Sequence, residues 1–291
     1  MSSTSPTSTG RDTTPPQAQD LPYPSCQVPS PPPQDYNARA KANAPHQQPR
    51  RWKPTVTWVI LVINILVWAL DALSSIVIGL LWNIPNVTLL LALGAKDNSM
   101  ILQGQVWRLV TPIFLHVGII HLAFNSYAIY IIGPQIECFF GPVRFLCIYL
   151  LSGIYGVLFS FALSAAPSAG ASGAIFGLIG TQAVFFYRYR NAFGQRGRRQ
   201  LYSTLSIIAF NLVLTFSGPN IDMWGHIGGL LAGGVLGWSL TPRYALAVTE
   251  TGQELIDLNH ARKWGMTVLG AIAVLIVSTG LTIIVQTTRL W

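Results

Sequence analysis

Charged residues are scarce in this chain of 291 residues. Lysine, arginine, aspartate and glutamate together make up 10% of it, whereas 51% of the residues are hydrophobic. A water-soluble domain carries about 25% charged residues. The shortage therefore excludes an ordinary cytosolic enzyme. Glycine is abundant instead, with 26 residues, and nine tryptophans suit the lipid–water interface of a membrane protein.

Acidic residues are the scarcer charge, with ten against 18 basic ones, which gives a net charge of +8. A basic balance is also typical of nucleic-acid-binding proteins. Here, however, the positive residues cluster between long apolar runs, a pattern that orients membrane proteins in the bilayer. We therefore expect membrane lipid, and no nucleic acid, as a partner.

Residues 1–53 contain almost no branched aliphatic side chains and are rich in Ser, Thr, Pro and Gln. Such a segment buries too little apolar area to offset the entropy of ordering, so we expect a disordered cytoplasmic tail. Its run of three prolines is also compatible with an extended segment that binds a partner. The tail does not have the pattern of a targeting presequence, which favours a bacterial plasma membrane.

Seven apolar segments follow the tail, and most approach the roughly 20 residues that cross a bilayer as a helix. They lie at about 55–80, 117–135, 143–164, 171–187, 202–218, 223–240 and 265–286. The stretch from 81 to 116 predicts an interfacial loop with amphipathic pieces. We expect an all-α polytopic membrane protein with its core over residues 54–241. Residues 242–291 would form a cytoplasmic linker and a seventh transmembrane helix.

Lysine and arginine predict the orientation of these spans. If every segment crosses the membrane, twelve basic residues share the side of the tail, and only Lys96, Arg108 and Arg289 lie on the other. The positive-inside rule then predicts a cytoplasmic N-terminus and an outside C-terminus.

Few strongly polar side chains interrupt the spans, and in lipid such residues are candidates for function. His121 and Asn125 lie near the start of the second span, Ser172 begins the fourth, and His226 is the fourth residue of the sixth. These three spans run in the same direction, so the four side chains should lie at similar depth near the outer face. Taken singly, each of these residues can be explained by helix packing. Explaining all four by packing would require four coincidences at one depth.

A serine and a histidine at one depth indicate acyl transfer, in which the histidine removes the serine proton and later protonates the leaving amine. Ser172 would lie among the unpaired backbone N–H groups of a helix start, where His121 and Asn125 can add donors to an oxyanion hole. Asp222, the nearby carboxylate, lies at the outer end of its span. We therefore expect a Ser–His dyad that needs no cofactor.

A zinc site is the other way to combine histidines, and the sequence disfavours it. There is no HExxH motif, and His116 and His121 are five residues apart, which is a poor spacing for one helix face. We therefore expect no metal.

Glycines recur at every fourth position beside the candidate residues. Gly225, Gly229, Gly233 and Gly237 form one such stripe on the sixth span, and Gly173 and Gly177 form a shorter one on the fourth. Stripes of small residues let two helix backbones approach closely. We expect these glycines to bring Ser172 and His226 within contact.

At these residues the chain resembles the rhomboid intramembrane serine proteases. The matching pieces, in the family's order, are Trp107-Arg108, His116-Val-Gly-Ile-Ile-His121-Leu-Ala-Phe-Asn125, Gly170-Ala-Ser172-Gly-Ala-Ile-Phe-Gly177 and Gly225-His226-Ile-Gly-Gly229. The resemblance implies that Ser172 is the nucleophile and His226 the base. It also implies an oxyanion hole made by His121, Asn125 and the Ser172 amide, with His116, Gly170 and Arg108 in supporting positions.

The same resemblance implies a six-helix core with one further helix, the 6+1 arrangement. Substrates would be single-span membrane proteins with small residues at the cut, entering laterally near the second and fifth spans. Inactive rhomboid-like proteins share the fold and bind membrane clients, but here the dyad is complete. A transporter or channel needs polar side chains along a path across the bilayer. In this chain the polar side chains of the spans are expected near the outer face, which disfavours transport.

Overall fold

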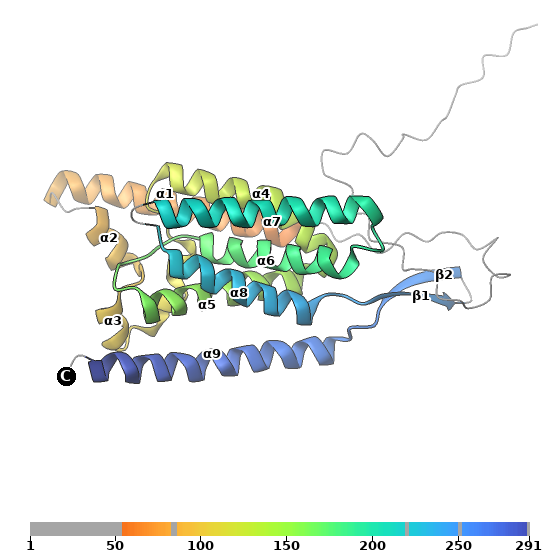
Figure 1. Ribbon diagram of the computed structural model, residues 1–291. Coiled ribbons are helices and arrows are strands. Elements are labelled where there is room, and N and C mark those ends of the chain that lie inside the picture. The colour runs from red at the N-terminus through yellow and green to blue at the C-terminus, as the bar shows by residue number, and fades with distance from the viewer. Residues whose placement is uncertain (1–53, 83–85, 219–220, 250–251, 290–291) are drawn as a thin grey trace, which may run out of the picture.

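The computed structural model describes residues 54–82, 86–218, 221–249 and 252–289, so the expected tail over 1–53 lies outside the described residues. The described chain is a helical bundle with one small hairpin (Figure 1). Its seven long helices each overlap most of one of the seven apolar segments. They are α1 (Thr55–Trp82), α4 (Ile119–Phe140), α5 (Pro142–Leu163), α6 (Ser172–Tyr189), α7 (Gly194–Ser217), α8 (Met223–Leu240) and α9 (Ala261–Arg289).

Five of these seven helices in the described ranges, α1, α4, α5, α7 and α9, are long and apolar enough to cross a membrane. The protein is therefore an integral membrane protein. The remaining two, α6 and α8, have 18 residues each and are rich in glycine, whose low hydropathy dilutes their apolar character. The 6+1 arrangement, the domain boundaries and the orientation in the membrane stay predictions.

The predicted interfacial loop folds into short helical pieces, α2 (Asn86–Leu93), α3 (Asn98–Leu102), η1 (Val106–Leu109) and η2 (Thr111–Phe114). Arg108 is buried inside this loop. Its guanidinium donates hydrogen bonds to the carbonyl oxygens of Leu91 and Ala95, at 2.6 and 2.7 Å, and to the side chain of Gln105. Arg108 thus closes the loop on itself.

Lys96 fastens the same loop to the segment that precedes α6. Its side chain is fully buried, and its ammonium donates to the carbonyl oxygens of Ser164 and Ala166, at 2.6 and 2.9 Å. Its backbone also pairs with that of Ser168. Burial lowers the pKa of Lys96 to about 8, so the group stays cationic at pH 7. The start of α6 is therefore anchored from outside the helix.

Three helices differ from the prediction by four residues or more at one end, because hydropathy marks the apolar part of a helix and not its hydrogen-bonded ends. α9 begins at Ala261 instead of residue 265. α4 continues past residue 135 to Phe140, through Pro134. α7 begins at Gly194 instead of residue 202, so Arg196, Arg198 and Arg199 lie in its first turns.

The predicted linker after α8 contains an antiparallel hairpin that the sequence analysis did not anticipate, made of β1 (Tyr244–Thr249) and β2 (Gly252–Asp257). Arg144, at the start of α5, pairs with Asp257 at 2.6 Å and donates to the carbonyl oxygen of Asn259. These long-range contacts hold the linker against the bundle.

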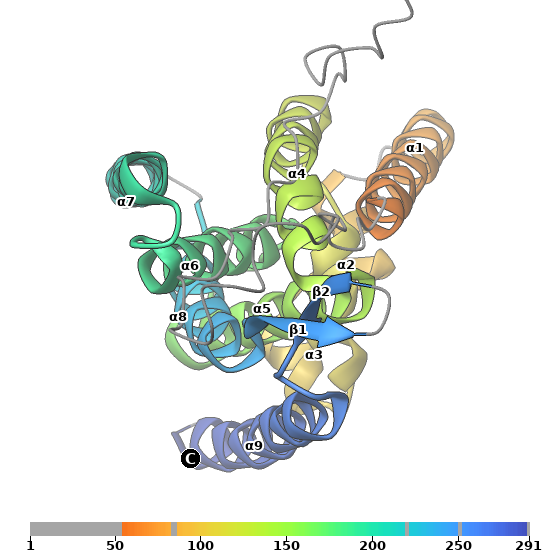
Figure 2. The ribbon, with the colours of Figure 1, turned by 90° about the vertical axis from the view of Figure 1, so that its right-hand side faces the viewer.

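Viewed along the bundle, α5, α6 and α8 lie at the centre, with α1, α7 and α9 at the periphery (Figure 2). The most apolar stretch of α9 has no buried residue, and that of α7 has 11% of its residues buried. These outer helices thus expose their apolar side chains as a lipid-facing surface would.

The glycine faces of α6 and α8 meet backbone to backbone. A Cβ atom added to Gly229 would collide with the carbonyl oxygen of Gly173, and one added to Gly233 would collide with that of Gly177. Further along, Gly237 lies against Thr181 of α6. The carbonyl oxygen of Gly225 lies against both Gly156 of α5 and Gly173 of α6, at 2.6 and 3.3 Å from where their Cβ atoms would be.

A buried carboxylate caps α1. Glu137, near the end of α4, accepts hydrogen bonds from the backbone N–H groups of Val56 and Thr57 and from the Thr57 hydroxyl, at 2.7 to 2.8 Å. Orphan N–H groups and the positive end of the helix dipole both favour an anion at a helix N-terminus. Glu137 thereby joins the first and second long helices.

We predict that Gly229→Ala destabilises the bundle, because the new methyl group forces α6 and α8 apart. Overpacking of this kind typically costs about 1–3 kcal/mol. Thermal unfolding in detergent measures it. Gly234→Ala on the same helix is the matched control, since a Cβ there meets nothing within 4 Å. Equal melting temperatures for the two variants would contradict the close approach.

We also predict that Glu137→Gln lowers stability by about 2–3 kcal/mol, because an amide offers one acceptor oxygen to three donors and lacks the charge. Thermal unfolding again measures the effect. Asp97→Asn removes the same charge at the N-cap of α3, where asparagine caps as well as aspartate. If Glu137→Gln had the same melting temperature as Asp97→Asn and the wild type, the capping role would be wrong.

Candidate active site

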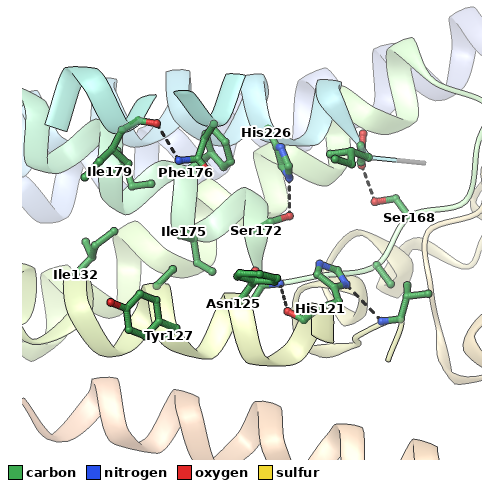
Figure 3. A pocket seen from close by; sticks show the side chains of 18 of the residues that line it. His121, Asn125, Tyr127, Ile132, Ser168, Ser172, Ile175, Phe176, Ile179 and His226 are labelled. Atoms are coloured by element: carbon green, nitrogen blue, oxygen red, sulfur yellow. Dashed lines mark hydrogen bonds between the residues drawn. The ribbon is translucent and has the colours of Figure 1, made fainter. Parts of the chain in front are cut away.

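Residues of α4, α6 and α8 border a cavity of about 720 Å³ (Figure 3). His121, Asn125, Ser172 and His226 all line it, together with apolar side chains and with residues of α7. These four residues come from three different spans, and they are the ones that the sequence predicted to lie at similar depth.

Ser172 and His226 are in direct contact. Ser172 is the first residue of α6, and its Oγ lies 2.8 Å from Nε2 of His226 in the first turn of α8. The imidazole of His226 is buried and stacks on the ring of Phe176, with centroids 4.3 Å apart and planes 15° from parallel. Phe176 follows Ser172 by one helical turn, so α6 supplies both the hydroxyl and the surface that orients the imidazole.

The other imidazole nitrogen of His226 contacts a residue that the sequence analysis missed. Nδ1 lies 2.9 Å from the hydroxyl of Thr215, a buried residue near the end of α7. Threonine is common in apolar helices, and no motif surrounds Thr215. Only the packing of α7 against α8 reveals the contact.

Asp222 serves as the N-cap of α8. Its carboxylate accepts from the N–H of Gly225 at 2.9 Å and from the hydroxyl of Ser168 at 2.6 Å. Ser168 is in the segment that Lys96 anchors, so the starts of α6 and α8 are tied to the same loop. Within the described residues no group of three His, Cys, Asp or Glu side chains gathers as a metal site would.

His121 and Asn125 lie opposite the Ser172–His226 pair. The N–H of Val117 donates to Nδ1 of His121 over 3.4 Å, which leaves the hydrogen on Nε2. The amide of Asn125 donates to the carbonyl oxygen of His121 at 2.9 Å and has a second N–H to offer. Both side chains are therefore donors that border the cavity.

Gly170 separates His121 from Ser172. Its φ of +148° is in the region that favours glycine, and an added Cβ would lie 2.7 Å from Cε1 of His121 and 3.6 Å from Oγ of Ser172. Any side chain at this position would fill the space between the two residues.

His116 is buried behind His121 and does not line the cavity. The two rings meet edge to face, with centroids 5.4 Å apart. Burial, reinforced by the neighbouring His121, lowers the pKa of His116 to about 4, so it is neutral at pH 7. Its position supports the ring of His121 by packing. Arg108 lies within the first loop, as described above, and not in the cavity.

Residues 103–243 match the family model of the Rhomboid domain. The rhomboid protease GluP of Bacillus subtilis (strain 168) is 43% identical over 186 residues, which are 62% of this chain and 34% of GluP. YdcA of the same organism is 35% identical over 189 residues, 64% of this chain and 88% of YdcA. Rhomboid-like protease 3 of Toxoplasma gondii is 33% identical over 205 residues, 68% of this chain and 78% of that protein. The chain thus spans about a third of the length of GluP.

Proposed function

This chain belongs to the rhomboid family, and from that premise we propose that it is an intramembrane serine endopeptidase. Its substrates would be single-span membrane proteins, cut within their transmembrane segments. The observation that carries the proposal is the 2.8 Å separation between Oγ of Ser172 and Nε2 of His226 at the edge of a cavity inside the bundle.

In the first step the hydroxyl proton of Ser172 passes to Nε2 of His226 while Oγ attacks the carbonyl carbon of the scissile peptide bond. A serine is a weak nucleophile without such a base. The stacking of Phe176 on the imidazole holds the base in place before substrate arrives, so little reorganisation is needed when the proton moves.

The carbonyl oxygen then carries the negative charge of a tetrahedral intermediate. Ser172 is the first residue of α6, where backbone N–H groups have no helical acceptor and the helix dipole is positive. The Nε2–H of His121 and the free N–H of Asn125 add side-chain donors across the cavity. Together they would form the oxyanion hole.

The protonated His226 next gives its proton to the nitrogen of the leaving amine, the peptide C–N bond breaks, and an acyl-enzyme ester remains on Ser172. A water molecule that loses its proton to His226 attacks this ester, and Ser172 recovers a proton as the new carboxyl product leaves. The cycle balances with peptide and water alone, so no metal or cofactor enters it.

We predict that Ser172→Ala and His226→Ala each abolish cleavage of a single-span reporter protein by the purified full-length chain in detergent. The two residues act as a unit, so the double variant should be no worse than either one. Ser278→Ala on α9 is the matched serine control, because its hydroxyl bonds only its own helix.

Asn125→Ala should lose less activity than Ser172→Ala or His226→Ala, since losing one oxyanion donor costs about 10²–10³ in rate at most where the other donors remain.

Near-wild-type cleavage by folded Ser172→Ala would overturn the mechanism. A wild-type chain that binds the reporter without cutting it would instead indicate a client-binding member of the family.

We further propose that the loop with Lys96 faces outward and that the N-terminus is cytoplasmic. In a background without native cysteines, a cysteine at the exposed position of Gln195, in the first turn of α7, should react with an impermeant maleimide only from the cytoplasmic side. A cysteine at the exposed Gln103 should react only from outside. The reverse labelling pattern would contradict the proposed orientation.

A further inference from the structure

We propose that Thr215 is a positioning residue for the catalytic base: its hydroxyl accepts the Nδ1–H of His226 and so selects the tautomer that can deprotonate Ser172. This inference rests on the proposed protease function and concerns how the same site is controlled. It assigns a role to α7, a helix that contributes no residue to the Ser172–His226 pair.

The geometry at His226 leaves one partner for each ring nitrogen. Nε2 lies 2.8 Å from Ser172 and Nδ1 lies 2.9 Å from the Thr215 hydroxyl. A neutral imidazole carries one N–H, and Nε2 must be free of hydrogen to accept the serine proton. The hydrogen therefore has to sit on Nδ1, and Thr215 is the acceptor in contact with it.

The titratable groups nearest His226 do not compete for this role. Asp222 is occupied by the N–H of Gly225 and the hydroxyl of Ser168. His121 receives the N–H of Val117 on its own Nδ1. In serine proteases with a carboxylate third member, that group holds the imidazole in the correct tautomer and stabilises the imidazolium that forms. A buried threonine hydroxyl can do the first of these tasks without placing a second charge in the membrane interior.

Thr215 also connects the base to the wall of the cavity. Ile207, Asn211 and Thr215 are spaced by four residues, so they share one face of α7, and Ile207 and Asn211 line the cavity directly. α7 packs loosely, with 11% of its apolar stretch buried, and a second polar contact, between Thr204 and Gln182 of α6, lies nearer its other end. A substrate segment that touches this face of α7 therefore acts on the helix that orients the base.

The experiment compares Thr215→Val, which keeps the shape and removes the hydroxyl, with Thr215→Ser, which keeps the hydroxyl. Two quantities are measured on the full-length protein in detergent. One is the rate at which a fluorophosphonate labels Ser172, which reports on the nucleophile without a peptide substrate. The other is kcat and KM for a single-span reporter with small residues at the cut.

We expect Thr215→Val to lower the labelling rate and kcat by roughly tenfold, which is the upper range for one hydrogen bond, with little change in KM. Thr215→Ser should restore most of the loss. A residue that only packs would show the opposite order, because valine is the closer match to threonine in shape.

Wild-type labelling and kcat in Thr215→Val would overturn the inference while leaving the proposed function intact. Equal losses in Thr215→Val and Thr215→Ser would also overturn it, since the hydroxyl would then not be the active feature. If Thr215→Val fails to fold, Thr215→Ala against Thr215→Ser carries the same comparison. A wild-type chain that is neither labelled nor active would refute the proposed function itself, and Ser172→Ala gives the baseline for that case.

Discussion

The backbone contact between α6 and α8 is the constraint on which the candidate site depends. Gly229 lies against the carbonyl oxygen of Gly173, so the two helix axes approach as closely as backbones allow. Ser172 precedes Gly173 by one residue, and His226 precedes Gly229 by less than one turn. A larger residue at Gly229 would move the helices apart, and a misplacement of about 1 Å in a reacting pair can cost on the order of 10²-fold in rate. The close packing of α6 and α8 and the contact between Ser172 and His226 therefore depend on the same short segments of the two helices.

Lipid as solvent explains how the rest of the molecule supports that contact. An unpaired polar group is costly in the hydrocarbon region, and three of the buried charged side chains are hydrogen-bonded to backbone groups. Glu137 caps the start of α1, Arg108 closes the first loop, and Lys96 holds the segment that leads into α6. The segment that Lys96 holds leads directly into α6, whose first residue is Ser172, and Asp222 caps the first turn of α8, which carries His226.

The sequence predicts the parts of this structure that follow from local periodicity. Apolar runs located all seven long helices, and the spacing of glycines by four anticipated that Ser172 and His226 would meet. The hairpin after α8 and the early start of α7 escaped prediction, because both depend on hydrogen bonds and contacts beyond the apolar segments. Thr215 escaped for a similar reason: its significance lies in a neighbour on another helix. Family membership is confirmed by the comparisons, whereas the roles of individual site residues remain proposals.

The most direct test of the central claim is to map, by mass spectrometry, where a fluorophosphonate attaches to the full-length wild-type chain in lipid nanodiscs. If the approach of α6 and α8 makes one serine nucleophilic, the adduct should be found on Ser172 alone, and it should vanish in His226→Ala. No adduct at Ser172, or an adduct that persists there without His226, would contradict the account.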